Sequence, residues 1–554
     1  MMSWKLKTHV LTSLTAGLFL TSCAALPEPI EVPQEAKLDL LIKGGLIYDG
    51  LGAQGRIGDI GIAENKIVFV GEAHSEAAAK QTLDAADLIV APGFIDPHTH
   101  ADKDLVSQDR KRRANLPYLF QGVTTVVVGN DGFGGSDIAA QAQTARARGI
   151  GTNAVYLAGF GPLRESVLGK QNRSPQTAEL ELMKAKLERA MCEGAAGFSA
   201  GLYYAPQNFA KTDEVAALAA VAGEHGGYYD THMRDESDYS IGLERSVAEA
   251  LAIGKRAQIP VHIAHIKALG PSVWGRSKRI IDMISAARAT GQSVTADQYP
   301  WEASGTRISN AIVPRWALDG GLEGLRLRLK EPVTRAKIAE EMEANLKRRG
   351  GAERLLFTGS LGAFKAKTGQ TLSDYSQAQG MGPVEAAIGL LQQGDMRVAS
   401  FVMNTQDINA LAVQPWVATG SDGSTGHPRK YASFPKAYRD LVVDEKLLSM
   451  AQFIRRSTAL PAQILGLKDR GALAAGMAAD VAVFDPRTFR PNATYAQPKE
   501  LSSGAVFVIV NGKLAITEGQ YSSELAGQPL LRAGRSAHAD CAMMSKPPTV
   551  TKPD

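Results

Sequence analysis

The chain has 554 residues and a formal net charge of +4 at neutral pH. Hydrophobic residues make up 44% and aromatic residues 6%, an ordinary balance for a globular protein that is long enough for a large core and more than one domain. So small a net charge gives no electrostatic reason to expect a nucleic-acid partner.

The N-terminal residues carry signals for export. A short basic start precedes the apolar run VLTSLTAGLFL, which is too short to span a membrane as a helix. The run ends in LTSC, residues 20–23, which resembles the bacterial lipobox, in which the cysteine is lipidated and becomes the new N-terminus. We therefore expect a lipoprotein signal peptide over residues 1–22 and a Pro- and Glu-rich tether over residues 23–37. Lipidated Cys23 would anchor an exported protein to the membrane, facing the periplasm or the exterior. A plain secretory peptide and a chance cysteine in an anchor helix are the alternatives.

Two further cysteines complete the set of three. If Cys23 carries lipid, the chain has no disulfide framework to build. Cys192 lies in a helical pattern, where we expect a buried thiol. Cys541 lies in a C-terminal tail, residues 526–554, that we expect to be poorly ordered.

Short apolar runs separated by Gly-rich turns occur near both ends of the chain, over residues 38–90 and 468–525. A different pattern fills the residues between them. We therefore expect one β-sandwich domain built from both chain ends, with a larger domain, residues 91–467, inserted in it.

Strand-like runs alternate with helical segments, such as residues 177–194 and 277–291, in the central region. Repeated strand–helix units indicate a parallel sheet, and eight of them fit a closed (β/α)8, TIM-like barrel. An open doubly wound sheet is the alternative, but no Gly-rich phosphate loop follows the first strand. The long interval before the eighth strand predicts an inserted lid subdomain at about residues 305–400. The eight strand candidates are residues 93–100, 123–131, 152–159, 194–202, 227–234, 260–267, 293–300 and 416–423.

Polar side chains recur at the carboxyl ends of these strands, where barrel enzymes hold their chemistry. In PGFIDPHTHAD, His98 and His100 are two residues apart, so both imidazoles share one face of the strand and can converge on a metal ion. Each later candidate also has a structural interpretation: His232 could be a core histidine, Asp131 could shape a turn and Asp422 could cap a helix. Their coincidence at strand ends favours a metal site. The later strand ends hold Asp131, Tyr203, Tyr204, His232, Arg234, His265, Lys267, Tyr299 and Asp422.

The chemistry of such a site suggests roles for several residues. A divalent metal lowers the pKa of bound water and supplies hydroxide at neutral pH, and a carboxylate beside it can move the proton. Asp422, on the last strand, suits that acid/base role. Lys267 and Arg429 are candidates for placing an anionic substrate. His262 lies off the face that His265 and Lys267 share, so we expect it to be a structural histidine behind the barrel wall.

Taken together, these segments resemble the amidohydrolase superfamily and, within it, the D-aminoacylase family of N-acyl-D-amino-acid deacylases. The resemblance covers roughly residues 38–520. It is carried by APGFIDPHTHAD, GVTTVVVGNDG, GFSAGLYYAP, THMRDE, HIAHIK, DQYPW, TGSDG, HPRKYASFPK, ADVAVFDP and VIVNGK.

The resemblance implies a (β/α)8 barrel on a β-sandwich, with zinc at the barrel mouth. One or two ions, or another divalent metal, would fit this expectation. Asp422 would act as the catalytic acid/base, and Arg429 would bind the free carboxylate of the substrate. The implied metal ligands are His98, His100, His232, His265 and Asp422, and the implied substrate-holding residues are Tyr204, Lys267, Tyr299 and Arg429.

Two features depart from the family pattern. The family usually reads GNCG, with cysteine as a metal ligand, whereas Asp131 stands at that position here. Aspartate also binds zinc, although it is a harder ligand than thiolate, and we include Asp131 in the predicted ligand set. The loop from Asp422 to Arg429, DGSTGHPR, is also shorter than usual, so the substrate pocket is expected to differ.

We therefore expect a lipid-anchored, metal-dependent amide hydrolase that deacylates N-acyl-D-amino acids by attack of metal-bound hydroxide. The small-molecule substrate would be an N-acyl amino acid or a peptide. The alternatives are a dipeptidase acting on D-containing or cell-wall-derived peptides, an enzyme that opens cyclic amides, and a binding lipoprotein that has lost turnover.

Overall fold

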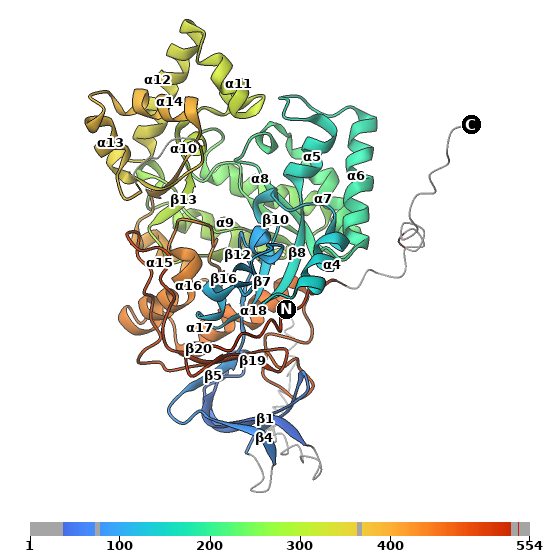
Figure 1. The fold of residues 1–554 in the computed structure, drawn as a ribbon. Helices are drawn as coiled ribbons and strands as arrows, with labels where there is room; N and C mark the ends of the chain where they lie inside the picture. The colour runs from blue at the N-terminus through green and yellow to red at the C-terminus, as the bar shows by residue number, and fades with distance from the viewer. Residues whose placement is uncertain (1–36, 73–77, 363–367, 533–540, 542–554) are drawn as a thin grey trace, which may run out of the picture.

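The computed structural model describes residues 37–72, 78–362 and 368–532 together with residue 541. The expected signal peptide, Cys23 and the tether up to residue 36 lie outside the described residues. Within these ranges, no helix combines the length and the apolar character that crossing a membrane requires. Figure 1 shows a β region at the bottom, a barrel in the centre and a helical extension at the top left.

The central sheet confirms the predicted parallel barrel. Eight strands lie side by side in chain order, and each falls within one of the eight predicted segments. A bridge between Thr99 and Gly423 brings the first and last strands together, and His100 N donates to Gly423 O at 3.1 Å. The strands are β6 (Phe94–Asp96), β7 (Val123–Val128), β8 (Asn153–Gly159), β9 (Gly197–Gly201), β10 (Tyr228–His232), β11 (Val261–Ile263), β12 (Val294–Gln298) and β16 (Val417–Thr419).

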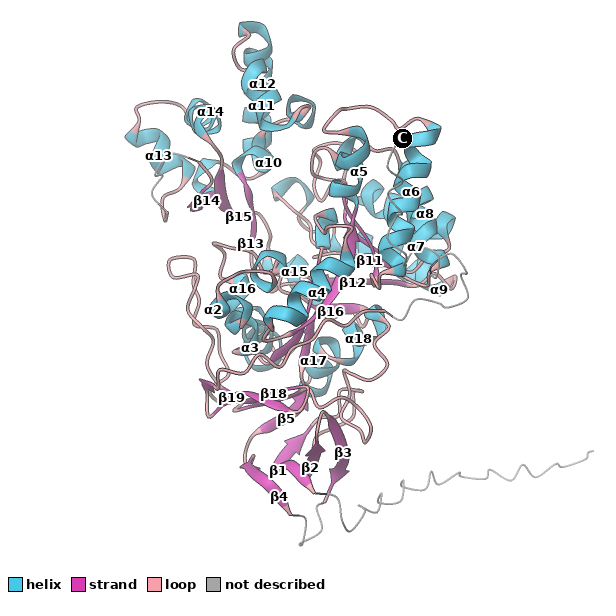
Figure 2. Cartoon of the chain, turned by 45° about the vertical axis from the view of Figure 1, so that its right-hand side comes forward, coloured by secondary structure: helices cyan, strands magenta, loops and turns pink. Residues whose placement is uncertain are grey.

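Helices cover the outer face of the barrel (Figure 2). They are α4 (Ile138–Arg148), α5 (Phe160–Leu168), α6 (Thr177–Cys192), α7 (Thr212–Glu224), α8 (Leu243–Ala257), α9 (Ser277–Ala289), α15 (Thr405–Ala412), α16 (Arg429–Tyr438), α17 (Met450–Ser457) and α18 (Ala459–Leu465). Three short helices follow β6: α1 (Asp102–Leu105), α2 (Arg110–Arg113) and α3 (Leu116–Leu119). Side-chain caps set some helix starts, since Asn404 accepts a hydrogen bond from Asp407 N at the start of α15.

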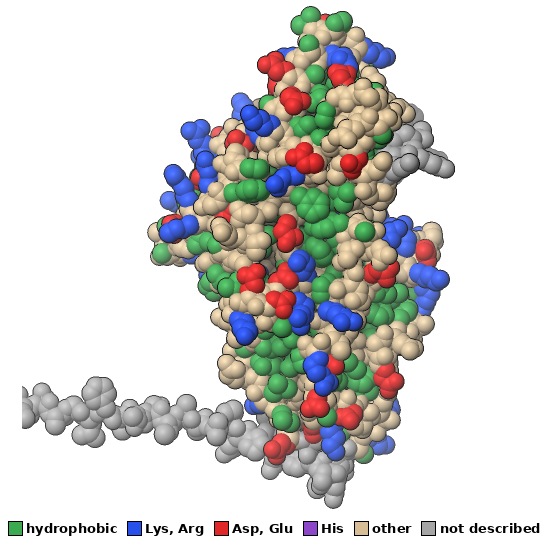
Figure 3. Space-filling model, turned by 90° about the vertical axis from the view of Figure 1, so that its left-hand side faces the viewer, with side chains coloured by type: hydrophobic (Ala, Val, Ile, Leu, Met, Phe, Trp, Pro, Cys, Tyr) green, Lys and Arg blue, Asp and Glu red, His purple; other side chains and the backbone are tan. Residues whose placement is uncertain are grey.

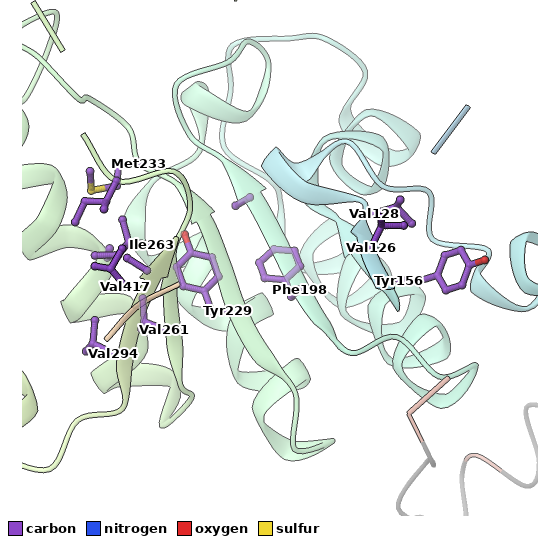
Figure 4. Packing of buried hydrophobic residues seen from close by; sticks show 14 of the residues in the cluster. Val126, Val128, Tyr156, Phe198, Tyr229, Met233, Val261, Ile263, Val294 and Val417 are labelled. Carbon is purple, nitrogen blue, oxygen red and sulfur yellow. The ribbon is translucent and has the colours of Figure 1, made fainter. Parts of the chain in front are cut away.

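The main hydrophobic core lies between strands and helices. Figure 4 shows Val261, Ile263 and Tyr229 among the buried side chains of this cluster. Because side chains alternate along a strand, the residues between them face the barrel interior instead. His262, between two core residues of β11, is one of these inward residues.

Both chain ends contribute to one β domain, as the sequence predicts. Nine strands form a single sheet in the order β20-β19-β18-β17-β5-β1-β2-β3, with β4 on β1. The sheet curls on itself, because Ile67 N of edge strand β3 donates to Met477 O at 2.9 Å, close to β17. Its core joins residues from both ends, such as Ile42 and Val481. The strands are β1 (Leu38–Ile47), β2 (Arg56–Ala63), β3 (Lys66–Gly71), β4 (Ala79–Asp84), β5 (Ile89–Pro92), β17 (Val481–Phe484), β18 (Ala505–Val510), β19 (Lys513–Thr517) and β20 (Gln520–Tyr521).

A subdomain with its own hydrophobic core separates β12 from β16. Its three-stranded antiparallel sheet has the order β13-β15-β14. On the face shown in Figure 3, basic and acidic side chains are interspersed. The elements are β13 (Ala303–Arg307), α10 (Ile308–Ile312), α11 (Gly321–Arg328), α12 (Pro332–Arg348), β14 (Leu355–Ser360), α13 (Leu372–Ala378), α14 (Pro383–Gln393) and β15 (Met396–Phe401).

The C-terminal segment corrects two expectations. Cys192 and Cys541 form a disulfide, so neither is a free thiol. The described part of the tail is also ordered, because Leu530 N donates to Ala154 O at 2.8 Å and Gly527 N donates to Ile150 O at 2.8 Å. These contacts join segments that are far apart in the sequence, and local composition does not encode them.

Candidate metal centre

The six predicted metal ligands meet at one end of the barrel. His98 and His100 follow β6, Asp131 lies in the 3-10 turn after β7 (Asn130–Gly132), and His232 ends β10. His265 follows the end of β11, and Asp422 follows the end of β16. All six side chains are buried except His100, which is partly exposed. They form two groups whose ligand atoms lie within 4.8 Å of one another: His98, His100, Asp131 and Asp422 in the first group, and Asp131, His232 and His265 in the second.

Asp131 belongs to both groups. Its Oδ1 lies 3.5 Å from His98 Nε2 and 3.3 Å from His265 Nε2, and 3.7 Å from His232 Nδ1. Its Oδ2 lies 3.5 Å from His100 Nε2. One carboxylate therefore faces four imidazoles, which is the position of a ligand shared between two neighbouring ions.

Asp422 closes the first group. Its Oδ1 lies 3.0 Å from His100 Nε2 and 3.7 Å from His98 Nε2. Its Oδ2 lies 2.8 Å from Arg429 Nη1. The carboxylate thus connects the metal groups to the adjacent cationic side chain.

Several polar atoms at this point have no hydrogen-bond partner despite being buried. They include both ring nitrogens of His98, His232 Nε2 and Asp131 Oδ1. Buried polar atoms are rarely left unsatisfied, because desolvation without a partner is costly. Imidazole and carboxylate groups converging in this way fit zinc or a similar divalent ion. The residues present therefore fit a metal centre.

Three of these ligands have backbone conformations that most side chains avoid. The φ angles are +58° at Asp131, +36° at His265 and +46° at Asp422. Positive φ at non-glycine residues concentrates at functional sites, where the surrounding structure enforces it. Here it turns side chains inward beyond the ends of β7, β11 and β16. This explains why His265 faces the site although it lies three residues after His262, which also faces inward.

A carboxylate that the sequence analysis did not single out supports the second group. Glu236 Oε1 lies 3.3 Å from His265 Nδ1, and Oε2 lies 3.7 Å from His232 Nε2. These are the ring nitrogens that point away from Asp131. A histidine that binds metal through one nitrogen usually donates its other N–H to such an acceptor. Glu236 therefore lies within reach of His265 Nδ1 and faces the unpaired Nε2 of His232. Its position four residues after His232 was the available sequence signal.

Asp297 lies behind the first ligand group, as Glu236 lies behind the second. Its Oδ2 lies 3.6 Å from His98 Nδ1 and 3.1 Å from His262 Nε2, and it accepts a hydrogen bond from His265 N at 3.1 Å. His262 is not in either ligand group, and its expected location behind the barrel wall is wrong. It lies inside the barrel, because β11 alternates around the outward-facing Val261 and Ile263.

The protonation states of His100 and Glu236 depend on their charged and hydrogen-bonding neighbours. Burial opposes protonation of His100, but hydrogen bonds to Asp131 and Asp422 raise its pKa to about 9. Burial also works against ionisation of Glu236, yet Lys267 and the nearby histidines hold the pKa of Glu236 below its usual range. A histidine must lose a proton to bind a metal, so metal binding here is coupled to pH.

The predicted substrate-holding residues line the same region. Lys267 Nζ donates to Glu236 Oε1 at 2.7 Å and lies 5.7 Å from the ring centroid of Tyr299. The guanidinium carbon of Arg429 lies 4.9 Å from the same centroid, and Tyr204 OH lies 3.4 Å from His232 Nδ1. All four side chains therefore surround the ligand groups.

A cavity of about 460 Å³ opens from these groups toward the inserted subdomain. Its walls include His100, Asp131, Asp422 and Arg429 from the barrel, and Arg307, Thr358 and Arg397 from the subdomain. This size suits a small organic ligand. The subdomain thus supplies part of the wall of the site, in agreement with its expected position at the barrel mouth.

Comparisons with known proteins agree with this geometry. The family model described as "Amidohydrolase family" matches residues 81–516. A D-aminoacylase of Alcaligenes xylosoxydans xylosoxydans is 30% identical, over 89% of this chain and 98% of its own length. An N-acyl-D-glutamate deacylase of the same organism is 31% identical, over 93% of this chain and 99% of its own. The crystal structure of N-acyl-D-glutamate deacylase from Bordetella bronchiseptica, complexed with zinc and a phosphonate that mimics the tetrahedral intermediate, superposes with a TM-score of 0.76. It is 30% identical and covers 90% of this chain and all of its own.

Proposed function

Since the chain belongs to the amidohydrolase family, we propose that it is a zinc-dependent deacylase of N-acyl-D-amino acids. The family and the deacylase relatives identify it as a metal-dependent hydrolase of amide C–N bonds. One observation supports deacylation of N-acyl-D-amino acids in particular. Two ligand groups share Asp131, and Asp422 lies between the first group and Arg429.

The ligand set would hold one or two divalent ions. When bound, zinc would polarise the amide carbonyl and lower the pKa of a water molecule. His98, His100, Asp131 and Asp422 would hold one position, and Asp131, His232 and His265 the other.

Asp422 is the residue best placed to move a proton. One carboxylate oxygen faces the first ligand group, and the other contacts Arg429. It can accept a proton from the attacking water and deliver it to the amide nitrogen of the leaving amino acid. Hydrolysis then yields a free carboxylic acid and an amino acid.

The cationic side chains would place the substrate. Arg429 is buried, with 2% of its surface exposed, and Asp422 is the carboxylate it contacts. A substrate carboxylate that reached Arg429 would gain a bidentate, charge-assisted contact. Tyr299, whose ring faces both Arg429 and Lys267, completes this end of the site.

Hydrolysis of paired N-acetyl-D- and N-acetyl-L-amino acids tests the proposal, with release of free amine as the readout. We expect turnover of the D-compounds, loss of turnover with a chelator and recovery when zinc is restored. Equal turnover of the L-compounds would refute the stereochemistry. Zinc-loaded protein that binds these compounds without hydrolysing them would indicate a binding protein instead.

We also propose that the protein is an exported lipoprotein anchored through Cys23. The charged, apolar and small-residue order that ends in LTSC supports this proposal.

A further inference from the structure

Two arginines of the inserted subdomain lie directly opposite each other. Arg307 on β13 pairs with Arg397 on β15 in the antiparallel register. Directly opposed residues of an antiparallel pair project from the same face of the sheet, and like charges in that position are destabilising. Arg307 is exposed and Arg397 is partly buried. Among the described residues, neither forms an ion pair or a side-chain hydrogen bond.

This arginine face points into the cavity of the metal centre. Both arginines line the 460 Å³ cavity together with Asp131, Asp422 and Arg429. Gly305 precedes Arg307 by two residues and so shares its face of β13. A Cβ added at Gly305 would lie 3.1 Å from Arg429 Nη2, so this face of β13 looks toward Arg429.

The spacing suits one small ligand with two anionic groups. Gly305, which abuts Arg429, and Arg307 are about 7 Å apart along the strand, given the rise of a β-strand per residue. A compound that places its α-carboxylate at Arg429 would bring a second anionic group near Arg307 and Arg397.

Asp395 lies within electrostatic range of both arginines but forms no direct ion pair with either of them among the described residues. Asp395 is the closest in sequence, but it accepts hydrogen bonds from Ser309 N and Oγ. Burial, followed by the charge of Arg307, lowers the pKa of Arg397. By contrast, the other arginine of the outer cavity wall, Arg112, is bonded to Asp104 at 2.5 Å. The paired charges are therefore maintained against their mutual repulsion, which an anionic ligand would relieve.

We propose that Arg307 and Arg397 form a subsite for a second carboxylate of the substrate. The inference rests on the proposed deacylase function and narrows its substrates to dianionic N-acyl-D-amino acids. The second carboxylate could belong to the amino-acid side chain, as in N-acyl-D-glutamate, or to the acyl group, as in N-succinyl compounds. Both sources present the same chemistry to the arginines.

Matched substrates of equal shape and different charge test the subsite. N-acetyl-D-glutamate is compared with N-acetyl-D-glutamine, and N-succinyl-D-alanine with its succinamoyl analogue. We expect kcat/KM to be at least about tenfold higher for the charged member of one pair, the size of a charge-assisted contact. The pair that shows the preference identifies the source of the carboxylate. Equal rates within both pairs would overturn the subsite but leave the deacylase function intact.

The variant Arg307→Gln/Arg397→Gln should abolish this preference, so that kcat/KM for the charged member of the pair falls to that for its uncharged analogue. It should not lower the melting temperature, because a repulsive pair is removed. Lys103→Gln is the matched control, since Lys103 also lines the cavity as an exposed cation. If the preference were lost in Lys103→Gln and retained in the arginine variant, the proposal would be wrong.

Calorimetric binding of N-acetyl-D-glutamate and N-acetyl-D-glutamine to the same proteins distinguishes failure of the subsite from failure of the proposed deacylase function. If no N-acyl-D-amino acid is hydrolysed, the proposed function fails. Tighter binding of the glutamate compound, lost in the double arginine variant, would still support the subsite. Equal binding of both compounds would refute it.

Discussion

Replacement of Asp131 tests the most unusual feature of the metal centre. Asp131 faces four imidazoles at 3.3–3.7 Å and belongs to both ligand groups. Asp131→Ala would leave three residues in the first group and only two histidines in the second. We therefore expect the second position to lose its metal first.

The size of the effect follows from the contacts that are lost. Interactions with charged groups are typically worth about 1.5–3 kcal/mol, which corresponds to a roughly 10- to 150-fold change in affinity. Because Asp131 serves both groups, metal affinity should fall by at least this factor. Activity should fall with metal content, and excess zinc should restore part of both.

Asp131→Asn is the matched control for the backbone. The φ angle of +58° at this residue costs about 1–2 kcal/mol in most side chains, but asparagine and aspartate tolerate it best. The asparagine variant should therefore keep the melting temperature of chelator-treated wild type while losing metal. Asp131→Cys should retain a metal site and shift its preference toward softer ions.

Metal content after dialysis, measured by mass spectrometry, and hydrolysis rates on the same samples provide the assay. Full metal content and full activity in both Asp131→Ala and Asp131→Asn would refute the ligand role. Asp131 would then only shape the turn after β7.

Four further outcomes are expected. Asp422→Asn should abolish turnover while the fold is retained, because the amide cannot accept the proton; near-normal turnover would exclude the acid/base role. Glu236→Gln should weaken metal binding by about 10- to 100-fold, the usual effect of removing an acceptor behind a ligating histidine, and unchanged metal affinity would contradict that role. Cys23→Ser should release the protein from the membrane fraction and leave hydrolysis unchanged; wild-type protein that is already soluble and unlipidated would disprove anchoring. Burial raises the pKa of Asp230 to about 6 from 3.8, and neither of its carboxylate oxygens has a hydrogen-bond partner. Between about pH 4 and about pH 6, the folded protein therefore retains the Asp230 proton that the unfolded chain has released. Over this range the free energy of unfolding falls as the pH rises, by about 3 kcal/mol in all. In chelator, Asp230→Asn should thus gain more stability over wild type at pH 7 than at pH 4, as read from urea midpoints; a gain independent of pH would show that Asp230 does not titrate in this range.

Local patterns in the sequence were sufficient to predict the barrel and the meeting of candidate ligands at its rim, whereas the ligand set itself was implied by the family resemblance. His98 and His100 are two residues apart on one strand, and this spacing alone places both imidazoles on one face. The other ligands follow strands whose apolar runs can be read directly. In a parallel barrel all strands end at the same rim, so residues at successive strand ends meet without any knowledge of their pairing.

The tertiary structure decided the contacts whose register no local pattern encodes. Glu236 lies behind His232 and His265 only because β10 and β11 are neighbours and the backbone turns at positive φ after β11. Arg307 faces Arg397 because two strands about 90 residues apart in the chain pair in one particular register. A shift of that register by one residue would turn each side chain to the other face. Periodicity determines which face of a strand is buried, whereas packing between distant segments determines which residues on that face meet.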